Sequence, residues 1–258
     1  MHDPVTLWCL PNAGASAALY AGWRRHLPAV AGQPPEPALR VALRVALRIA
    51  PLELPGRGAR AAEPLCEDFG ALCDDLEHAL TRQLLPGQPY ALFGHSMGAL
   101  LAHELAHRLR DRHPPRALFV AGAAAPALRD PSRFAGPLDD ASLLAQMRAL
   151  GGTPPELLDD PEMMAIALPI LRADYRACAS YRARAVAPLS CALHAFGGRD
   201  DRAVGQAITG WRCESTGPTS LTWYDGGHFF VRDAVPDLLA RMARLLADSR
   251  VPDAVAPC

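Results

Sequence analysis

The sequence feature that most constrains the fold is a serine flanked by glycines, in the run Gly94-His95-Ser96-Met97-Gly98. The apolar residues before it, Tyr90 to Phe93, are typical of a buried strand, and Ala99 to Leu109 is typical of a helix. A Gly-x-Ser-x-Gly pattern between a strand and a helix forms a tight turn that lifts the serine hydroxyl above a sheet edge. The pattern therefore predicts a strand–turn–helix unit with Ser96 as a nucleophile.

Short apolar runs alternate with helical segments along the rest of the chain. The expected strands are Val5 to Leu10, Ala117 to Ala121, Ser190 to Phe196 and Leu221 to Tyr224. The expected helices are Glu67 to Leu85, a mixed stretch from about Leu138 to Tyr181, and Val235 to Ala247. This alternation predicts an α/β fold whose sheet is mostly parallel and covered by helices on both faces. The tandem Val-Ala-Leu-Arg units at Val41–Arg48 are too few for a repeat protein and indicate no function.

Composition argues against several classes of function. The chain has 26 basic and 27 acidic residues in 258, and its arginines are scattered, which argues against nucleic-acid binding. No apolar run approaches the length of a membrane span, and the N-terminus lacks a secretory signal, so we expect a cytoplasmic protein without membrane association. Its cysteines form no C-x-x-C pair, and no dinucleotide-binding loop is present, so neither a metal nor a cofactor is expected.

A serine nucleophile needs an imidazole that takes its proton and a carboxylate that orients the imidazole. His228 follows the last expected strand, after two glycines that leave a loop free to reach Ser96. Asp200 and Asp201 both follow the strand that ends at Phe196, and either can orient His228. The spacing within this loop favours Asp201. The chain order Ser96, Asp201, His228 is that of α/β-hydrolases.

When a serine hydroxyl attacks a carbonyl group, an oxyanion forms, and backbone N–H donors are required to stabilise it. The motif assigns one donor to Met97, the residue after the nucleophile, and the other to the loop after the first strand, where Ala13 is the candidate. The alternative for this loop is a plain turn before a helix.

Further motifs are spread over nearly the whole chain. They are Leu7-Trp8-Cys9-Leu10-Pro11-Asn12-Ala13-Gly14, Leu54-Pro55-Gly56-Arg57, Leu150-Gly151-Gly152-Thr153-Pro154-Pro155 and Leu168-Pro169-x-Leu171-Arg172-Ala173-Asp174. Together with the Ser96 and His228 motifs, they resemble the type II thioesterases, stand-alone α/β-hydrolases that work beside nonribosomal peptide and polyketide synthases. The family's usual His-Ala-Gly-Gly loop reads Asn12-Ala13-Gly14-Ala15 here.

The resemblance implies a single α/β-hydrolase domain over residues 1–258, with a helical lid at about 135–183. It implies that Ser96, Asp201 and His228 form a catalytic triad and that Ala13 and Met97 frame the oxyanion hole. The substrate would be an acyl thioester on the phosphopantetheine arm of an acyl or peptidyl carrier protein, hydrolysed through an acyl-enzyme. Phosphopantetheine then enters only with the substrate.

Other hypotheses about the function remain open. The same fold serves acyl-CoA hydrolases, free-ester hydrolases and acyltransferases, and a non-catalytic binding module is a further alternative. Asp174 is expected to be either a polar contact within the lid or a solvated helix residue.

Overall fold

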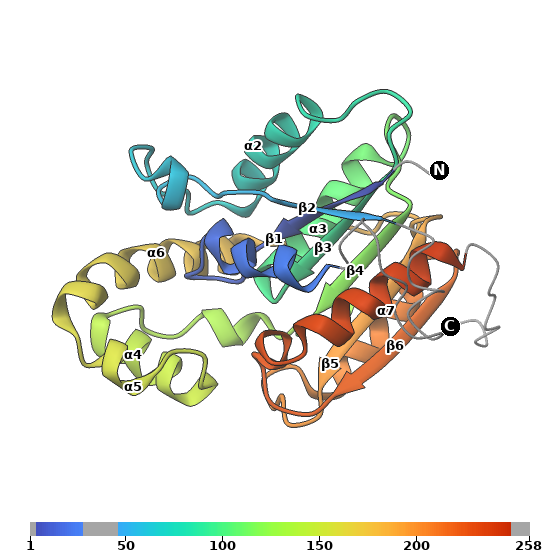
Figure 1. Cartoon of the computed structure of the whole chain (residues 1–258). Helices are drawn as coiled ribbons and strands as arrows, with labels where there is room; N and C mark the ends of the chain where they lie inside the picture. Colours follow the sequence, from blue (N-terminus) through green and yellow to red (C-terminus); the bar gives the residue numbers. More distant parts are fainter. Residues whose placement is uncertain (1–3, 28–45, 249–258) are drawn as a thin grey trace.

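The computed structural model describes residues 4–27 and 46–248. Within these residues six parallel strands form one sheet, in the order β2-β1-β3-β4-β5-β6. Their bounds are β1 Val5–Leu10, β2 Leu47–Pro51, β3 Tyr90–His95, β4 Ala117–Ala121, β5 Ala192–Gly198 and β6 Thr219–Tyr224. The parallel sheet confirms the predicted fold class (Figure 1).

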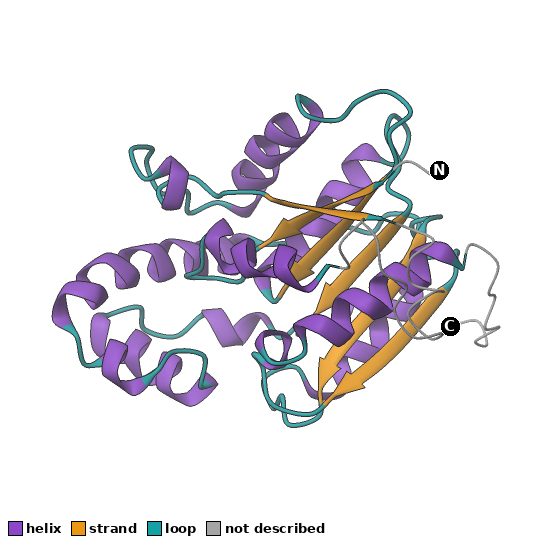
Figure 2. Ribbon diagram, in the orientation of Figure 1, coloured by secondary structure: helices purple, strands orange, loops and turns teal. Residues whose placement is uncertain are grey.

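Helices cover both faces of this sheet. One face carries the 3₁₀ helix η1 (Ala17–His26) and α7 (Val235–Ala247), and the other carries α2 (Phe69–Thr81), α3 (Met97–Leu109) and the 3₁₀ helix η5 (Gly205–Glu214). Figure 2 shows α7 in front of the strands and α3 behind them. Because both faces are covered, the central strands β1, β3 and β4 are buried along their whole length, which explains their continuous apolar runs.

Three helices between β4 and β5 form a separate layer, which we call the three-helix insertion. They are α4 (Asp140–Leu150), α5 (Pro155–Leu158) and α6 (Pro161–Ser180). Asp139 and Asp160 cap the first amides of α4 and α6, and Gly151 ends α4 in the left-handed conformation. The insertion has an apolar cluster of its own, which includes Leu143 and Leu168. It occupies the segment where the resemblance places a lid (Figure 1).

The remaining described elements are short 3₁₀ turns: η2 Gly58–Arg60, η3 Pro126–Leu128, η4 Pro131–Phe134 and η6 Phe230–Arg232. Residues 41–45 of the tandem repeat lie outside the described residues, and Leu47 and Arg48 belong to β2. The helix expected from Glu67 begins at Phe69, because the Asp68 side chain caps it. None of the helices in the described ranges is long and apolar enough to cross a bilayer.

Candidate active site

Ser96 lies in a strained turn between β3 and α3. Its φ of 55° and ψ of −116° make it the one non-glycine residue with positive φ among those that the structure describes. The flanking glycines allow close packing around this turn. A Cβ on Gly94 would lie 2.0 Å from the carbonyl oxygen of Gly98, and a Cβ on Gly98 would lie 2.2 Å from that of Leu10. The strain holds the Ser96 hydroxyl at the carboxyl edge of the sheet.

The hydroxyl of Ser96 lies next to His228, which is 132 residues away in sequence. Nε2 of His228 is 3.0 Å from Oγ of Ser96, and Nδ1 of His228 is 2.8 Å from Oδ2 of Asp201. His228 and Asp201 are both buried. The loops after β3, β5 and β6 thus bring the three predicted side chains into one hydrogen-bonded chain.

Asp201, and not Asp200, is the carboxylate that reaches His228, because Asp200 is exposed on the turn. The other oxygen of Asp201, Oδ1, accepts a hydrogen bond of 3.0 Å from the Ala203 amide. Burial opposes ionisation of Asp201, but the hydrogen bonds from His228 and from the Ala203 amide outweigh it, so the pKa of Asp201 lies below its usual value. Asp201 is therefore ionised at neutral pH and keeps the proton of His228 on Nδ1.

The candidate oxyanion donors are the backbone amides of Met97 and Ala13. Met97 is the first residue of α3, and the first amides of a helix have no acceptor within the helix. Ala13 lines the same cavity as Ser96 and Met97. Both residues thus lie at the cavity that contains Ser96, and their role as oxyanion donors stays a prediction.

A buried ion pair holds the Ala13 loop against the three-helix insertion. Oδ2 of Asp174 on α6 accepts a hydrogen bond of 2.7 Å from the amide of Gly14. The same carboxylate receives two hydrogen bonds from the Arg57 guanidinium, of 2.5 and 2.7 Å. The side chains of Arg57 and Asp174 are 2% and 0% exposed. Asp174 is therefore a buried polar contact of the insertion, and of its two expected roles the solvated one is wrong.

Two residues that the sequence analysis left without a role support His228. Nε2 of His95 lies 2.8 Å from the backbone oxygen of His228, and because a carbonyl only accepts, His95 donates this hydrogen bond. Burial and the neighbouring His228 ring lower the pKa of His95 to about 3, so its ring is neutral. The Asn12 side chain donates to the oxygen of Ala13 at 2.9 Å, and its own oxygen lies 3.5 Å from Nδ1 of His95. Asn12 thus contacts both the Ala13 loop and the ring that holds His228.

Ser96 and His228 line a cavity of about 290 Å³ between the sheet edge and the three-helix insertion. Met147, Leu171 and Tyr175 of the insertion line it, so part of the insertion's apolar surface faces the cavity that contains Ser96. Three arginines also line the cavity: Arg129, Arg133 and Arg232. The cavity thus combines apolar walls with cationic groups.

Comparisons with known proteins identify the family and the fold. The family model for the thioesterase domain matches residues 37–246. Thioesterase PikA5 of Streptomyces venezuelae is 36% identical over 257 residues, which cover 98% of this chain and 85% of the relative. The solved structure of RedJ, a thioesterase of the prodiginine pathway of Streptomyces coelicolor, superposes with a TM-score of 0.79 at 34% identity, covering 93% of this chain and 90% of RedJ. BorB, a type II thioesterase from the borrelidin cluster, superposes at 0.77 with 34% identity, covering 94% and 92% of the two chains. The fold is that of the α/β-hydrolases.

Proposed function

The chain belongs to the thioesterase family, and on that premise we propose that it hydrolyses acyl thioesters carried on the phosphopantetheine arm of acyl or peptidyl carrier proteins. The proposal rests on two hydrogen bonds, one between Asp201 and His228 and one between His228 and Ser96. Ser96 and His228 also line the cavity. Among serine hydrolases this arrangement serves acyl transfer.

The proposed reaction has two halves. Oγ of Ser96 attacks the thioester carbonyl while Nε2 of His228 takes the hydroxyl proton, and the N–H groups of Ala13 and Met97 stabilise the oxyanion. The C–S bond then breaks, the pantetheine thiol leaves with the proton from His228, and the acyl group stays on Ser96. In the second half a water molecule gives its proton to His228 and attacks the acyl-enzyme. The carboxylic acid leaves, and the proton returns to Ser96.

Two observations support a carrier-bound substrate. RedJ and BorB are thioesterases of the prodiginine pathway and of the borrelidin cluster, and the resemblance to type II thioesterases implies a substrate held on a carrier protein. The arginines at the cavity provide positive charge where the phosphate of the arm would approach. In this proposal the three-helix insertion acts as a lid over the acyl group, and phosphopantetheine is part of the substrate rather than a cofactor.

Mass spectrometry of acyl release from a loaded carrier protein tests the proposal. Ser96→Ala should lower the single-turnover rate by about 10⁴-fold or more, because the variant lacks the hydroxyl that lies 3.0 Å from Nε2 of His228. The matched control is Ser190→Ala. Ser190 is exposed and precedes β5 at the amino edge of the sheet, opposite Ser96, so this variant should release the acyl group at the wild-type rate.

The same assay separates the alternatives. We expect carrier-bound acyl groups to turn over with a higher kcat/KM than the same acyl groups on coenzyme A or on an aryl ester. A preference for coenzyme A or the ester would contradict the carrier substrate while leaving the Ser96 mechanism intact. Full activity of Ser96→Ala on every substrate would contradict both.

A further inference from the structure

Three potential metal ligands lie together outside the candidate active site. His103 and His107 are one turn apart on α3, and Glu214 is the last residue of η5. Nε2 of His103 lies 3.1 Å from Nε2 of His107 and 3.3 Å from Oε2 of Glu214. One ligand atom from each residue lies within 4.8 Å of the others. The proposed thioesterase chemistry does not use these residues.

Nε2 of His103 has two close polar neighbours but can form only one of the two hydrogen bonds well. A ring nitrogen carries either one hydrogen or one in-plane lone pair. If Nε2 of His103 carries a hydrogen, it can donate well to His107 or to Glu214 but not to both. If Nε2 of His103 carries no hydrogen, its lone pair faces the carboxylate of Glu214 and is repelled by it. A cation in place of the hydrogen would be attracted to both nitrogens and to the carboxylate.

We propose that His103, His107 and Glu214 bind a divalent transition-metal ion, and that this ion is Zn²⁺. Zinc sites are usually tetrahedral, with metal–ligand distances near ~2.0–2.1 Å, which places neighbouring ligand atoms roughly 3.3 Å apart. The two closest separations in the cluster, 3.1 and 3.3 Å, match this spacing. Two imidazoles and one carboxylate form a set that zinc accepts, with the fourth position open to water.

The surroundings favour such a site. The side chains of His103 and Glu214 are 6% and 20% exposed, so the histidine is shielded while the carboxylate side is open to solvent. The His103 ring packs edge-on against the buried Trp211, whose indole N–H donates to the Ala123 oxygen at 2.8 Å.

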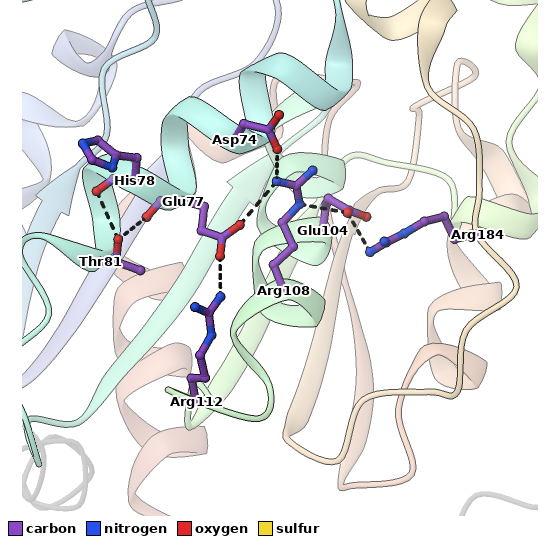
Figure 3. Close-up of polar contacts among 8 residues, drawn as sticks. All are labelled: Asp74, Glu77, His78, Thr81, Glu104, Arg108, Arg112 and Arg184. Atoms are coloured by element: carbon purple, nitrogen blue, oxygen red, sulfur yellow. Dashed lines mark hydrogen bonds and ion pairs between the residues drawn. The ribbon is translucent and has the colours of Figure 1, made fainter.

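The position of the site suggests what the ion would do. Helix α3 leads away from Ser96, and η5 follows the loop that carries Asp201. On its other side α3 is joined to α2 by ion pairs, in which Arg108 contacts both Asp74 and Glu77 (Figure 3). A metal at His103 and Glu214 would give α3 a second attachment, to η5, and would stabilise the segments that support the serine and the aspartate.

Zinc titration of the full chain, without an affinity tag and after chelator treatment, tests the proposal. We expect isothermal titration calorimetry to show one Zn²⁺ per chain, and Co²⁺ to give the visible absorption of a tetrahedral complex. Glu214→Gln, which keeps the side-chain shape, should weaken Zn²⁺ binding by at least 10-fold, and His107→Asn by at least 100-fold. Zn²⁺ should raise the Tm of the wild type and leave that of His107→Asn unchanged.

The double variant His78→Asn with His113→Asn is the matched control. Both histidines are exposed and lie near the same helices, so their loss should leave Zn²⁺ affinity at the wild-type value. Circular dichroism and acyl release by Glu214→Gln without metal establish that this variant is folded. Equal Zn²⁺ affinity in the wild type and His107→Asn, or loss of binding only in the His78/His113 variant, would overturn the proposal. Neither result would bear on the thioesterase function.

Discussion

The buried ion pair between Arg57 and Asp174 makes a quantitative prediction. Asp174→Asn keeps the shape of the side chain but removes its charge, which leaves the guanidinium of Arg57 buried without a counter-charge. It also weakens the acceptor for the Gly14 amide in the loop that carries Ala13. The substitution therefore perturbs the stability of the fold and the geometry of the candidate oxyanion hole.

The structure sets the expected size of the effect. With side-chain exposures of 2% and 0%, solvent does not screen the pair. Burial raises the pKa of Asp174, while the hydrogen bonds from Arg57 and Gly14 oppose that rise. Breaking a buried pair by removing one partner costs about 3–5 kcal/mol. Because asparagine still offers one oxygen acceptor, we expect the free energy of unfolding to fall by about 3 kcal/mol. For a chain of this size this lowers the Tm by roughly 6–12 °C.

Urea denaturation and acyl-release kinetics together test this reasoning. We expect kcat of Asp174→Asn to fall by about 10-fold with little change in KM, since the loop that positions the donor is loosened and the acyl cavity is kept. The matched control is Asp159→Asn in the same insertion. The ion pair of Asp159 with Arg148 is 69% and 54% exposed, so its loss should change stability by less than about 1 kcal/mol.

The double replacement Arg57→Met with Asp174→Leu separates the buried charge from general damage to packing. It should recover much of the stability lost in Asp174→Asn, because neither buried charge remains. A loss below 1 kcal/mol in Asp174→Asn, or a double variant less stable than the single one, would refute the assignment of an energetically important buried pair.

Three further predictions concern catalysis, pH and packing. Asp201→Asn should lower kcat by about 10⁴-fold, as in other serine hydrolase triads, with a small change in Tm; a residual rate near wild type would exclude Asp201 as the residue that orients His228. Burial lowers the pKa of His194 to about 4 in the native protein, whereas a histidine in the unfolded chain has a pKa of about 6.5. Between these two pH values the unfolded chain binds a proton that the native protein does not bind, so the free energy of unfolding falls as the pH falls from about 6.5 to 4. In pH-dependent urea titrations His194→Asn should make this decline shallower by roughly 1 kcal/mol per pH unit, and an unchanged slope would contradict the assignment. Gly98→Ala, whose Cβ would lie 2.2 Å from a backbone oxygen, should destabilise the fold by about 3 kcal/mol in thermal melts. Gly22→Ala, with open space around its Cβ, should be within about 1 kcal/mol of wild type, and similar losses in both would refute the packing argument.

Much of the fold could be predicted from local patterns of apolar residues in the sequence. The strands Val5–Leu10 and Ala117–Ala121 and the helix Val235–Ala247 have the bounds that their apolar patterns predict. They could be predicted because each apolar run ends at a residue that breaks or caps the element. The 3₁₀ helix η5 was missed, because its Gly205-to-Glu214 sequence has no strong apolar period.

The amino-acid sequence by itself determined which residues stand at the sheet edge, because the Ser96 turn and the loops after two late strands carry their own glycine and acid patterns. It left open whether Asp200 or Asp201 reaches His228, since neighbouring residues on a turn differ only in the direction that the folded backbone gives them.

Only the tertiary structure decided the contacts between segments far apart in the chain. Asp174 meets Arg57 and Gly14 across 117 and 160 residues, and Glu214 meets His103 across the interface of α3 and η5. The expectation that no metal is bound rested on the missing C-x-x-C pair and dinucleotide-binding loop, and our zinc proposal revises it. The physical reason is that periodicity and turn chemistry act over a few residues, whereas the position of a buried charge or ligand depends on how whole elements pack.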